Sequence, residues 1–505
     1  MSSTDTGKVE REAKLGAWPG FAMPDLDDVV PGVTVEARPP LDLDATYVDT
    51  ADLALVRNGA SLRRRTGEGA PRWTLKLPAA SSDAVLARRE LDVEDAGSTL
   101  PGELARLVTG WVRRSPLAPV AVIRSHRQRL VLLGPDGAQL AEIDDDEVSV
   151  IDGETVAARF REVEVELSAG GTDDLLEAVT AALVAAGAGA PDPTSKVARA
   201  LGPRALIPPD LVTTPPDADA TMADVVAAAL RRSAKTLIDH DHVVRLDDDI
   251  EGVHKMRVAT RRLRSDLQTL APVLEVGWAD ELRADLKGLA ATLGVVRDTD
   301  VLLQRLRRHI GELPADDRPL AVRVVDRLED ERRVQVADLL ATLEADAYLD
   351  LLDEVVAGAL EPRLAPSGSD PASDVLPELV RPRWRRLRKA VHALGAHPDD
   401  DALHRVRILA KRTRYAAELA APVIGEEAAA LAAQLTQVQD VLGEVHDTVV
   451  AEAWLRDAAA TLDHEARFVA GQLAATQRAE RTALLDTWPA TWAACDRKAL
   501  TGWLR

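Results

Sequence analysis

The sequence predicts an α+β protein of two domains, a mainly antiparallel β-sheet or barrel followed by an all-α part. Apolar and polar residues alternate in short runs over the first 200 residues, which is typical of strands. A proline-rich stretch at 206–220 breaks both helix and strand and indicates a linker. Beyond it, residues 221–505 form long segments rich in Ala, Leu and Arg with helical spacing. We therefore expect one domain at 1–205 and a second at 221–505.

Strands and turns can be placed within the first domain. The alternating runs predict strands at 8–15, 60–65, 72–77, 86–93, 120–133, 139–150 and 159–167. Glycine-containing segments at 67–69 and 134–137 predict hairpin turns between such strands. Helical spacing appears at 100–112 and 172–186. These segments predict an antiparallel sheet or barrel with a few helices.

Composition narrows the class of protein. The formal net charge is -21 and the pI is about 5.0, which argues against a general nucleic-acid coating protein. The one cysteine, Cys495, forms no internal disulfide and fits a reducing cytosol. The first residues do not resemble a signal peptide, and no apolar run of 18 residues lacks charges. We expect a soluble cytoplasmic protein with no membrane partner.

A basic pattern occurs twice in the helical half, about 150 positions apart. The first copy spans 254–264 and the second spans 404–414. Because successive helical residues turn by about 100°, each copy places one histidine and three cations in a narrow arc. These two stripes are His254, Arg257, Arg261 and Arg264, and His404, Arg407, Lys411 and Arg414. In so acidic a chain, two cationic stripes indicate an anionic ligand with many charges in a row.

The repeat continues beyond the stripes. A Leu-Gly-x-x-[Arg/His]-Asp segment at 293–298 returns at 442–447 with nearly the same offset. A second breaker stretch at 362–377 separates the two copies, so we expect two similar helical bundles, at about 221–361 and 378–505. The alternative is a solvated helix face whose arginines pair with carboxylates one turn away. His254 and His404 are then interior groups or metal ligands, although no further His or Cys stands at ligand spacing.

In the first domain, charged residues recur on one face of several predicted strands. Because side chains alternate along a strand, the following residues fall on common faces: Glu10, Glu12 and Lys14; Glu162, Glu164 and Glu166; Glu142, Asp144 and Asp146; Arg63 and Arg65; Arg127 and Arg129. A sheet with one solvated face gives similar alternation. Three successive carboxylates on one face repel one another, however, unless cations lie opposite. A closed barrel with a charged, hydrated interior satisfies both sets.

Such an interior predicts a site for a divalent metal and a polyanion. Carboxylates gather Mg²⁺ or Mn²⁺, which prefer oxygen ligands. Arginine and lysine hold phosphate oxygens, and a metal neutralises charge on a transferring phosphoryl group. No glycine-rich phosphate loop is visible, so the chain is not a P-loop enzyme.

The ordered motifs of residues 8–200 resemble the CYTH domains, or triphosphate tunnel metalloenzymes. They are Glu10-x-Glu12-x-Lys14, Leu62-Arg63-Arg64-Arg65, Thr74-Leu75-Lys76, Arg89-Glu90, Glu162-x-Glu164-x-Glu166 and Ser195-Lys196. The resemblance implies an eight-stranded antiparallel barrel that forms a tunnel and hydrolyses or cyclises triphosphates with a divalent metal.

The resemblance also implies roles for particular residues. The expected catalytic residues are Glu10, Glu12 and Lys14. The expected metal ligands are Glu10, Glu12, Asp144, Glu162, Glu164 and Glu166, with Asp145 and Asp146 as alternatives to Asp144. The expected phosphate-binding residues are Arg63, Arg65, Lys76, Arg127, Arg129 and Lys196.

Residues 221–505 resemble the CHAD domain, a helical domain that often follows a CYTH domain. The resemblance implies binding of inorganic polyphosphate through the basic pattern: His254, Arg257, Arg261, Arg262, Arg264, His404, Arg407, Lys411, Arg412 and Arg414. We expect hydrolysis of inorganic triphosphate with Mg²⁺ or Mn²⁺, and association with polyphosphate granules. The alternatives are a non-catalytic polyphosphate scaffold, a nucleotide cyclase or a thiamine triphosphatase.

Overall fold

The computed structural model describes residues 8–504 apart from 79–85, 96, 98 and 396, and it describes no side chains for residues 8–10, 86 and 87. The chain divides into two compact units, one ending at Pro209 and the other beginning at Asp210. Each unit has its own architecture and is described by itself.

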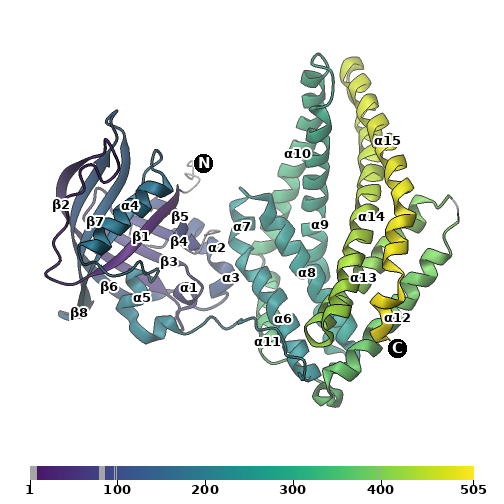
Figure 1. The fold of residues 1–505 in the computed structure, drawn as a ribbon, viewed down its shortest axis with the longest axis horizontal. Coiled ribbons are helices and arrows are strands. Elements are labelled where there is room, and N and C mark those ends of the chain that lie inside the picture. The colour runs from purple at the N-terminus through teal and green to yellow at the C-terminus, as the bar shows by residue number, and fades with distance from the viewer. Residues whose placement is uncertain (1–7, 79–85, 96, 98, 396, 505) are drawn as a thin grey trace. The chain divides into compact units, whose positions relative to one another are not determined.

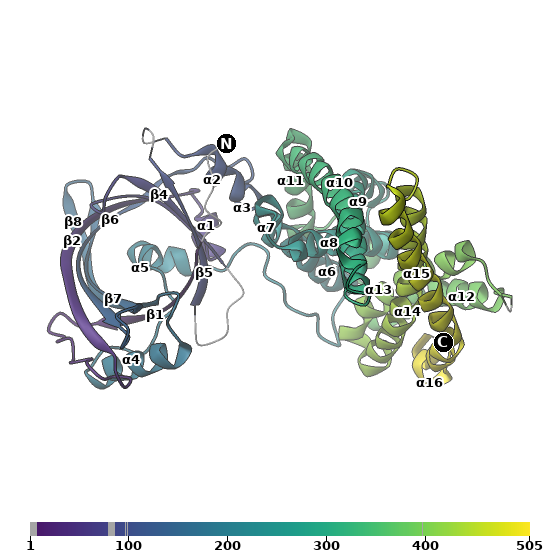
Figure 2. The same ribbon diagram turned by 90° about the horizontal axis from the view of Figure 1, so that it is seen from above.

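The first unit is a closed antiparallel barrel, as predicted (Figures 1 and 2). Its strands follow the order β1-β5-β4-β3-β2-β6-β7-β8 and close between β8 and β1. They are β1 (Lys8–Ala17), β2 (Thr34–Asp49), β3 (Ser61–Thr66), β4 (Arg72–Pro78), β5 (Leu86–Glu94), β6 (Ala118–Leu133), β7 (Gln139–Asp152) and β8 (Thr155–Leu167). Strand β2 was absent from the seven strands that the sequence analysis predicts. Its ladder with β6 shifts register between Arg38 and Leu41, around two prolines that cannot donate to the ladder.

The first unit also contains helices, which are α1 (Ala54–Arg57), α2 (Gly102–Leu107), α3 (Thr109–Val112), α4 (Asp173–Ala185), α5 (Lys196–Leu201) and the 3₁₀ turn η1 (Gly202–Leu206). The helix expected at 100–112 is two short helices, α2 and α3. Helix α4 starts at the Thr172 cap, whose side chain accepts from the Leu175 N–H.

One apolar cluster of this unit lies outside the barrel, and a smaller one that includes Tyr47 and Val197 borders the barrel interior. Leu15, Val163 and Val165 point outward from β1 and β8 and are fully buried against α4, through residues such as Val179 and Leu183. Side chains at alternate positions on the same strands point inward and are charged. The strand period therefore places apolar side chains under α4 on the outer face of β1 and β8 and charged side chains on their inner face.

The second unit is all helical and duplicated. Its first part contains α6 (Met222–Asp239), α7 (Asp241–Leu246), α8 (Ile250–Leu270), η2 (Ala271–Val273), α9 (Trp278–Ile310), α10 (Arg318–Glu344), α11 (Asp346–Leu360) and η3 (Pro366–Ser369). Its second part contains α12 (Ala372–His392), α13 (Asp400–Ile424), α14 (Glu426–Ala458), α15 (His464–Cys495), α16 (Lys498–Thr501) and η4 (Gly502–Leu504). Figure 1 shows the long pair α9 and α10 alongside α14 and α15.

The two parts begin side by side. The Met222 N–H donates to the Asp370 carbonyl at 3.0 Å and the Ala372 N–H donates to the Ala220 carbonyl at 3.0 Å, which ties the start of α6 to the start of α12. Helix α12 starts at Ala372, inside the stretch expected to break structure, and carries Pro377 and Pro382 within it. Among the described helices, none is both long and apolar enough to cross a membrane.

Candidate functional site

Inward-facing side chains of the barrel surround a cavity of about 160 Å³. Of the described residues, eight basic and seven acidic ones line it, and a packed core does not tolerate so many charges without a charged occupant or dense pairing. The basic residues are Lys14, Arg63, Arg65, Lys76, Arg88, Arg127, Arg129 and Lys196. The acidic residues are Glu12, Glu68, Glu90, Glu142, Asp144, Glu164 and Glu166.

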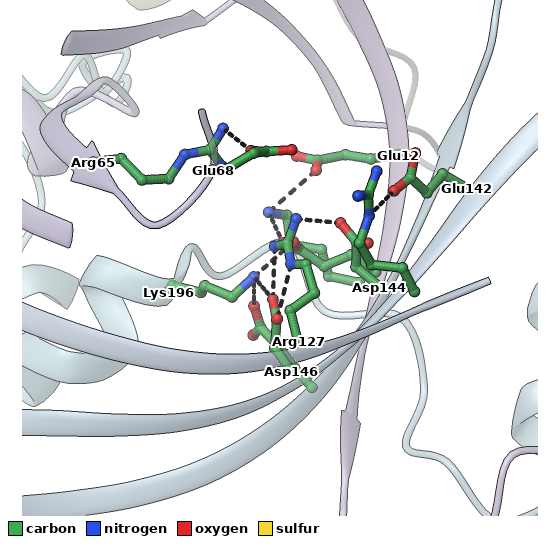
Figure 3. A network of polar contacts seen from close by, with 12 residues as sticks. Glu12, Arg65, Glu68, Arg127, Glu142, Asp144, Asp146 and Lys196 are labelled. Carbon is green, nitrogen blue, oxygen red and sulfur yellow. Dashed lines mark hydrogen bonds and ion pairs between the residues drawn. The ribbon is translucent and has the colours of Figure 1, made fainter. Parts of the chain in front are cut away.

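Glu164 lies at the centre of a charge network, of which Figure 3 shows Arg127, Asp146 and Lys196. Its carboxylate accepts from Lys14 Nζ at 2.5 Å and from Lys196 Nζ at 2.6 Å, and Arg127 Nη2 lies 3.4 Å away. Burial alone raises the pKa of Glu164, but these three cations hold that pKa well below its ordinary value. Glu164 is therefore ionised and fully engaged, and it positions two lysines and an arginine around the cavity.

Arg127 settles which aspartates face the interior. Its guanidinium donates to both Asp146 oxygens, at 2.9 and 2.8 Å, and also pairs with Asp144. Asp145 faces outward and pairs with Arg161 at 2.6 Å. The alternation of side chains along β7 thus decides which of the three aspartates face the interior, since Asp144 and Asp146 share the inner face.

The network is buried at one end and exposed at the other. At the buried end, Lys196 Nζ lies 2.7 Å from Asp146 and 2.9 Å from Glu162, and both carboxylates have no exposed surface. Figure 2 shows α5, which carries Lys196, inside the ring of strands. At the other end, Arg129 Nε pairs with Glu142 at 2.6 Å, and their side chains are 25% and 22% exposed. Glu162 was expected among the metal ligands, but it is not among the described residues that line the cavity.

The remaining predicted residues of the barrel are also placed. Lys76 pairs with Glu90 at 2.7 Å, and Arg63 Nη1 lies 3.3 Å from the Tyr47 hydroxyl. Glu166 lines the cavity. The backbone of Glu10 pairs with Arg88 between β1 and β5, but the Glu10 side chain lies outside the described residues.

Glu12 and Asp144 in the cavity wall each have one buried carboxylate oxygen, Glu12 Oε1 and Asp144 Oδ1, to which the described residues donate no hydrogen bond. Burial raises the pKa of Asp144 to about 7, against the opposing effect of Arg127, and Asp146, Glu164 and Glu142 add to the rise. Within the described part of the chain no three carboxylate, His or Cys groups form a ready metal cage. Mg²⁺ commonly uses one or two carboxylates together with substrate phosphates, so Glu12 and Asp144 fit a metal that binds with the substrate.

Sequence reasoning assigned no role to several of the described lining residues, among them Tyr47, Glu68 and Arg88. Tyr47 lies on β2, the strand that the sequence analysis did not predict, and Glu68 lies in the turn between β3 and β4. Arg88 alternates with Glu90 along β5, and this period was a usable signal for it.

In the helical unit, the two stripes approach each other. Helix α8 carries Arg257 and Arg261, and α13 carries Arg407 and Lys411. Burial, followed by the charges of Arg407, Arg261 and Arg257, lowers the pKa of Lys411 to about 7, while Asp447 opposes this. The four cations are therefore close enough to destabilise one another in the absence of an anion.

The repeated Leu-Gly-x-x-[Arg/His]-Asp segments support these arginines. The Arg257 guanidinium lies against Gly294 and pairs with Asp298 at 2.9 Å, and Arg407 lies equivalently against Gly443. A Cβ at either glycine would lie 3.8–3.9 Å from the guanidinium, which is an ordinary van der Waals contact, so both arginines pack closely on the next helix. Asp447 opposes the burial-driven fall in the Arg407 pKa, as an aspartate equivalent to Asp298 should.

The histidines flank this cluster. The rings of His404 and His446 lie 4.5 Å apart. Burial and then Arg407 lower the pKa of His446 to about 4, and burial also lowers the pKa of His254 and His404. These rings are neutral hydrogen-bonding groups at pH 7.

Four other predicted residues are placed around the edge of the cluster. Arg262 pairs with Glu418 at 2.6 Å, and Arg414 lies 3.4 Å from the same carboxylate and 4.8 Å above the Tyr415 ring. Burial and then the charge of Arg283 lower the pKa of Arg264, and burial followed by the charges of Arg386 and Arg412 lowers the pKa of Arg383 on α12. The structure thus brings Arg257, Arg261, Arg407 and Lys411 together, and Arg261 shares the Tyr415 ring with Arg262 and Arg414.

Comparison with known proteins assigns the family. The CYTH domain model matches residues 23–201, and the CHAD domain model matches residues 228–456. Uncharacterized protein Rv2226 of Mycobacterium tuberculosis is 35% identical over 477 residues, which is 88% of each chain. Among solved structures, PptA from Streptomyces chartreusis is 24% identical with a TM-score of 0.47, covering 54% of this chain and 100% of its own. The CHAD domain from the plant Ricinus communis is 27% identical with a TM-score of 0.48, covering 56% and 96%. The chain therefore belongs to the proteins that join a CYTH domain, of the triphosphate tunnel metalloenzyme superfamily, to a CHAD domain.

Proposed function

We propose that the barrel hydrolyses inorganic triphosphate to pyrophosphate and phosphate with Mg²⁺ or Mn²⁺. The observation that carries this proposal is the pairing, in one cavity, of a dense set of cations with carboxylate oxygens of Glu12 and Asp144 that accept no hydrogen bond from the described residues. The cations match a chain of phosphates, and the free oxygens match a hard divalent metal.

The side chains of the barrel have separable tasks. Lys14, Arg127 and Lys196 are held in place by Glu164 and Asp146, so they meet phosphate oxygens without first having to be ordered. Arg63 and Lys76 offer further donors from neighbouring strands. Glu12 and Asp144 would hold the metal, which when bound supplies charge neutralisation and a water of lowered pKa. Attack of water at the terminal phosphorus breaks its anhydride bond, pyrophosphate leaves, and the water's proton passes to solvent.

The lining of the cavity favours an inorganic substrate over a nucleotide or thiamine triphosphate. Among the described lining residues, Tyr47 is the aromatic one, and Val197 is the apolar one. A base or thiazolium ring needs a stacking platform or an apolar wall, and this cavity offers charges in nearly every direction.

A substrate panel tests the proposal. We expect phosphate release from inorganic triphosphate in Mg²⁺ or Mn²⁺, with kcat/KM at least about tenfold above that for ATP or thiamine triphosphate. The reason is that a cavity lined by charges offers a base or thiazolium ring few favourable contacts. Chelation of the metal with EDTA should abolish release, and added Mg²⁺ should restore it. Release from triphosphate that persists in EDTA, or a preference for ATP, would contradict the proposal.

We also propose that the helical unit binds inorganic polyphosphate at the cluster formed by Arg257, Arg261, Arg407 and Lys411. The electrostatics of the cluster support this proposal: burial and the charges of Arg261 and Arg257 lower the pKa values of Arg407 and Lys411, so these two cations gain free energy when an anion lies beside them. Polyphosphate binding by this cluster would bring a cytoplasmic protein to polyphosphate granules, which imaging of granule-bearing cells can check against a variant lacking the cluster.

Polyphosphate affinity is expected to fall as the pH rises from 6 to 8. Lys411 has a pKa of about 7 in the free protein, so it is charged at pH 6 and largely neutral at pH 8. A bound polyanion favours the charged form, so binding at pH 8 must also take up a proton. The His446 pKa of about 4 keeps that ring neutral across this range. Lys411→Arg should flatten the pH profile of the dissociation constant, and an equally steep profile in that variant would assign the effect to another group.

A further inference from the structure

Glu68 is held at the exposed end of the barrel cavity by the turn between β3 and β4. Its neighbour Gly67 has φ +103°, and a Cβ at that position would lie 1.9 Å from the carbonyl oxygen of Asp42 on β2. Only glycine fits there, so the turn is pressed against the β2 backbone. Glu68 follows directly, and its side chain turns into the cavity wall rather than into solvent.

The Glu68 carboxylate forms an ion pair with Arg65, an arginine that faces the cavity. It lies 2.9 Å from Arg65 Nη2, as Figure 3 shows, and the Arg65 side chain is 10% exposed. The charge of Glu68 also acts on Arg129, the second arginine at this end. Glu68 thus faces two of the cations expected to bind phosphate.

The exposed fractions of the side chains around the cavity show which end of it opens to solvent. The Glu68 side chain is 31% exposed, whereas Lys196 is 9% exposed and its partners Asp146 and Glu162 are fully buried. A phosphate chain whose inner end lies among Lys14, Arg127 and Lys196 directs its outer end toward Arg65 and Arg129. Any phosphate beyond those arginines meets the negative charge of Glu68.

We propose that Glu68 is a specificity-determining residue at the exposed end of the barrel cavity, where its charge disfavours the binding of phosphate chains that extend beyond the cavity. The inference rests on the proposed triphosphatase function and adds the chain-length preference of the same site. Glu68 competes for Arg65 in the free protein and repels the additional phosphate of a longer substrate. Its effect therefore falls on substrate binding.

The test compares Glu68→Gln with Glu154→Gln in the full-length protein, using inorganic triphosphate and inorganic tetraphosphate with Mg²⁺. Glu154 lies exposed in the turn between β7 and β8, so the control makes the same change of charge in another hairpin of the barrel. For Glu68→Gln we expect the ratio of kcat/KM for tetraphosphate to that for triphosphate to rise at least about fivefold, through KM. A ratio equal to that of Glu154→Gln overturns the proposal. So does a fall in kcat for triphosphate of tenfold or more, because it would make Glu68 part of the catalytic apparatus.

A binding measurement separates this inference from the proposed reaction. If the wild-type protein releases no phosphate, the triphosphatase proposal fails, but calorimetric titration of both variants with the two oligophosphates still decides the role of Glu68. The helical unit is identical in the two variants, so a difference between their oligophosphate affinities arises from binding in the barrel. A rise of about fivefold in relative tetraphosphate affinity supports the role of Glu68, and equal affinities overturn it.

Discussion

Replacing Glu12 by glutamine is expected to lower kcat/KM for inorganic triphosphate by at least about 100-fold in Mg²⁺. Glu12 is 3% exposed, its Oε2 lies 3.2 Å from Lys14 Nζ, and its Oε1 accepts no hydrogen bond from the described residues. Glutamine keeps the shape of the side chain but removes the charge that a divalent metal requires. Steady-state phosphate release, measured over a range of Mg²⁺ concentrations, checks the loss and shows whether excess metal recovers part of it.

The matched control for this variant is Glu147→Gln. Glu147 lies on β7, three positions from Asp144, and is exposed on the outer face of the barrel. It makes the same change in net charge without touching the cavity, so its kcat/KM should stay within about twofold of wild type. Equal activity of the Glu12 and Glu147 variants would remove Glu12 from the metal site. Absence of activity in the wild type would favour the non-catalytic scaffold.

Replacing Arg261 and Lys411 together by glutamine is expected to weaken long-chain polyphosphate binding by about 100-fold near 0.15 M salt. The two side chains come from α8 and α13 and belong to the convergent cluster, so the double variant removes one cation from each wall. The dependence of affinity on salt should also weaken, with the slope of log affinity against log salt falling by about one to two units. Titrations at several salt concentrations provide both quantities.

Arg307→Gln with Arg333→Gln is the control for that double variant. These arginines lie on α9 and α10, are 57% and 76% exposed, and pair with Glu329 and Asp330. The control removes the same net charge from the same unit but away from the cluster, and its affinity should stay within about threefold of wild type. If both double variants lose affinity equally, binding depends on overall charge and the cluster has no special role.

The barrel and its charged interior were predictable because side chains alternate strictly between the two faces of a strand, which fixes the residues that share a face. Glu12, Lys14, Glu164 and Glu166 share the inner face in the sequence pattern and in the structure. Strand β2 had a usable signal that the sequence analysis missed, because Leu41, Leu43, Ala45 and Tyr47 alternate with polar residues after the two prolines. The alternation could not show that Glu162 is enclosed with Lys196, because burial along the barrel axis depends on where α5 lies.

The helical unit shows a similar division. Helical spacing placed each stripe on one face, and the matching offsets indicated duplication. The convergence of Arg261 with Lys411 depends on how α8 packs on α13, which spacing within one helix does not contain. The same limit applies to Arg262, whose partner Glu418 lies on the other repeat, more than 150 positions away. The turn residue Glu68 was placed in a hairpin correctly, but its inward direction follows from the packing of Gly67 on β2.

A crystal structure of the protein with Mn²⁺ and inorganic triphosphate tests the central claim most directly, because the anomalous signal of manganese locates the metal without reference to activity. The account predicts a manganese peak beside the carboxylates of Glu12 and Asp144, with phosphate oxygens contacting Lys14 and Arg127 inside the barrel. Metal and triphosphate bound on the outer surface, with the barrel interior free of both at saturating concentrations, would contradict it.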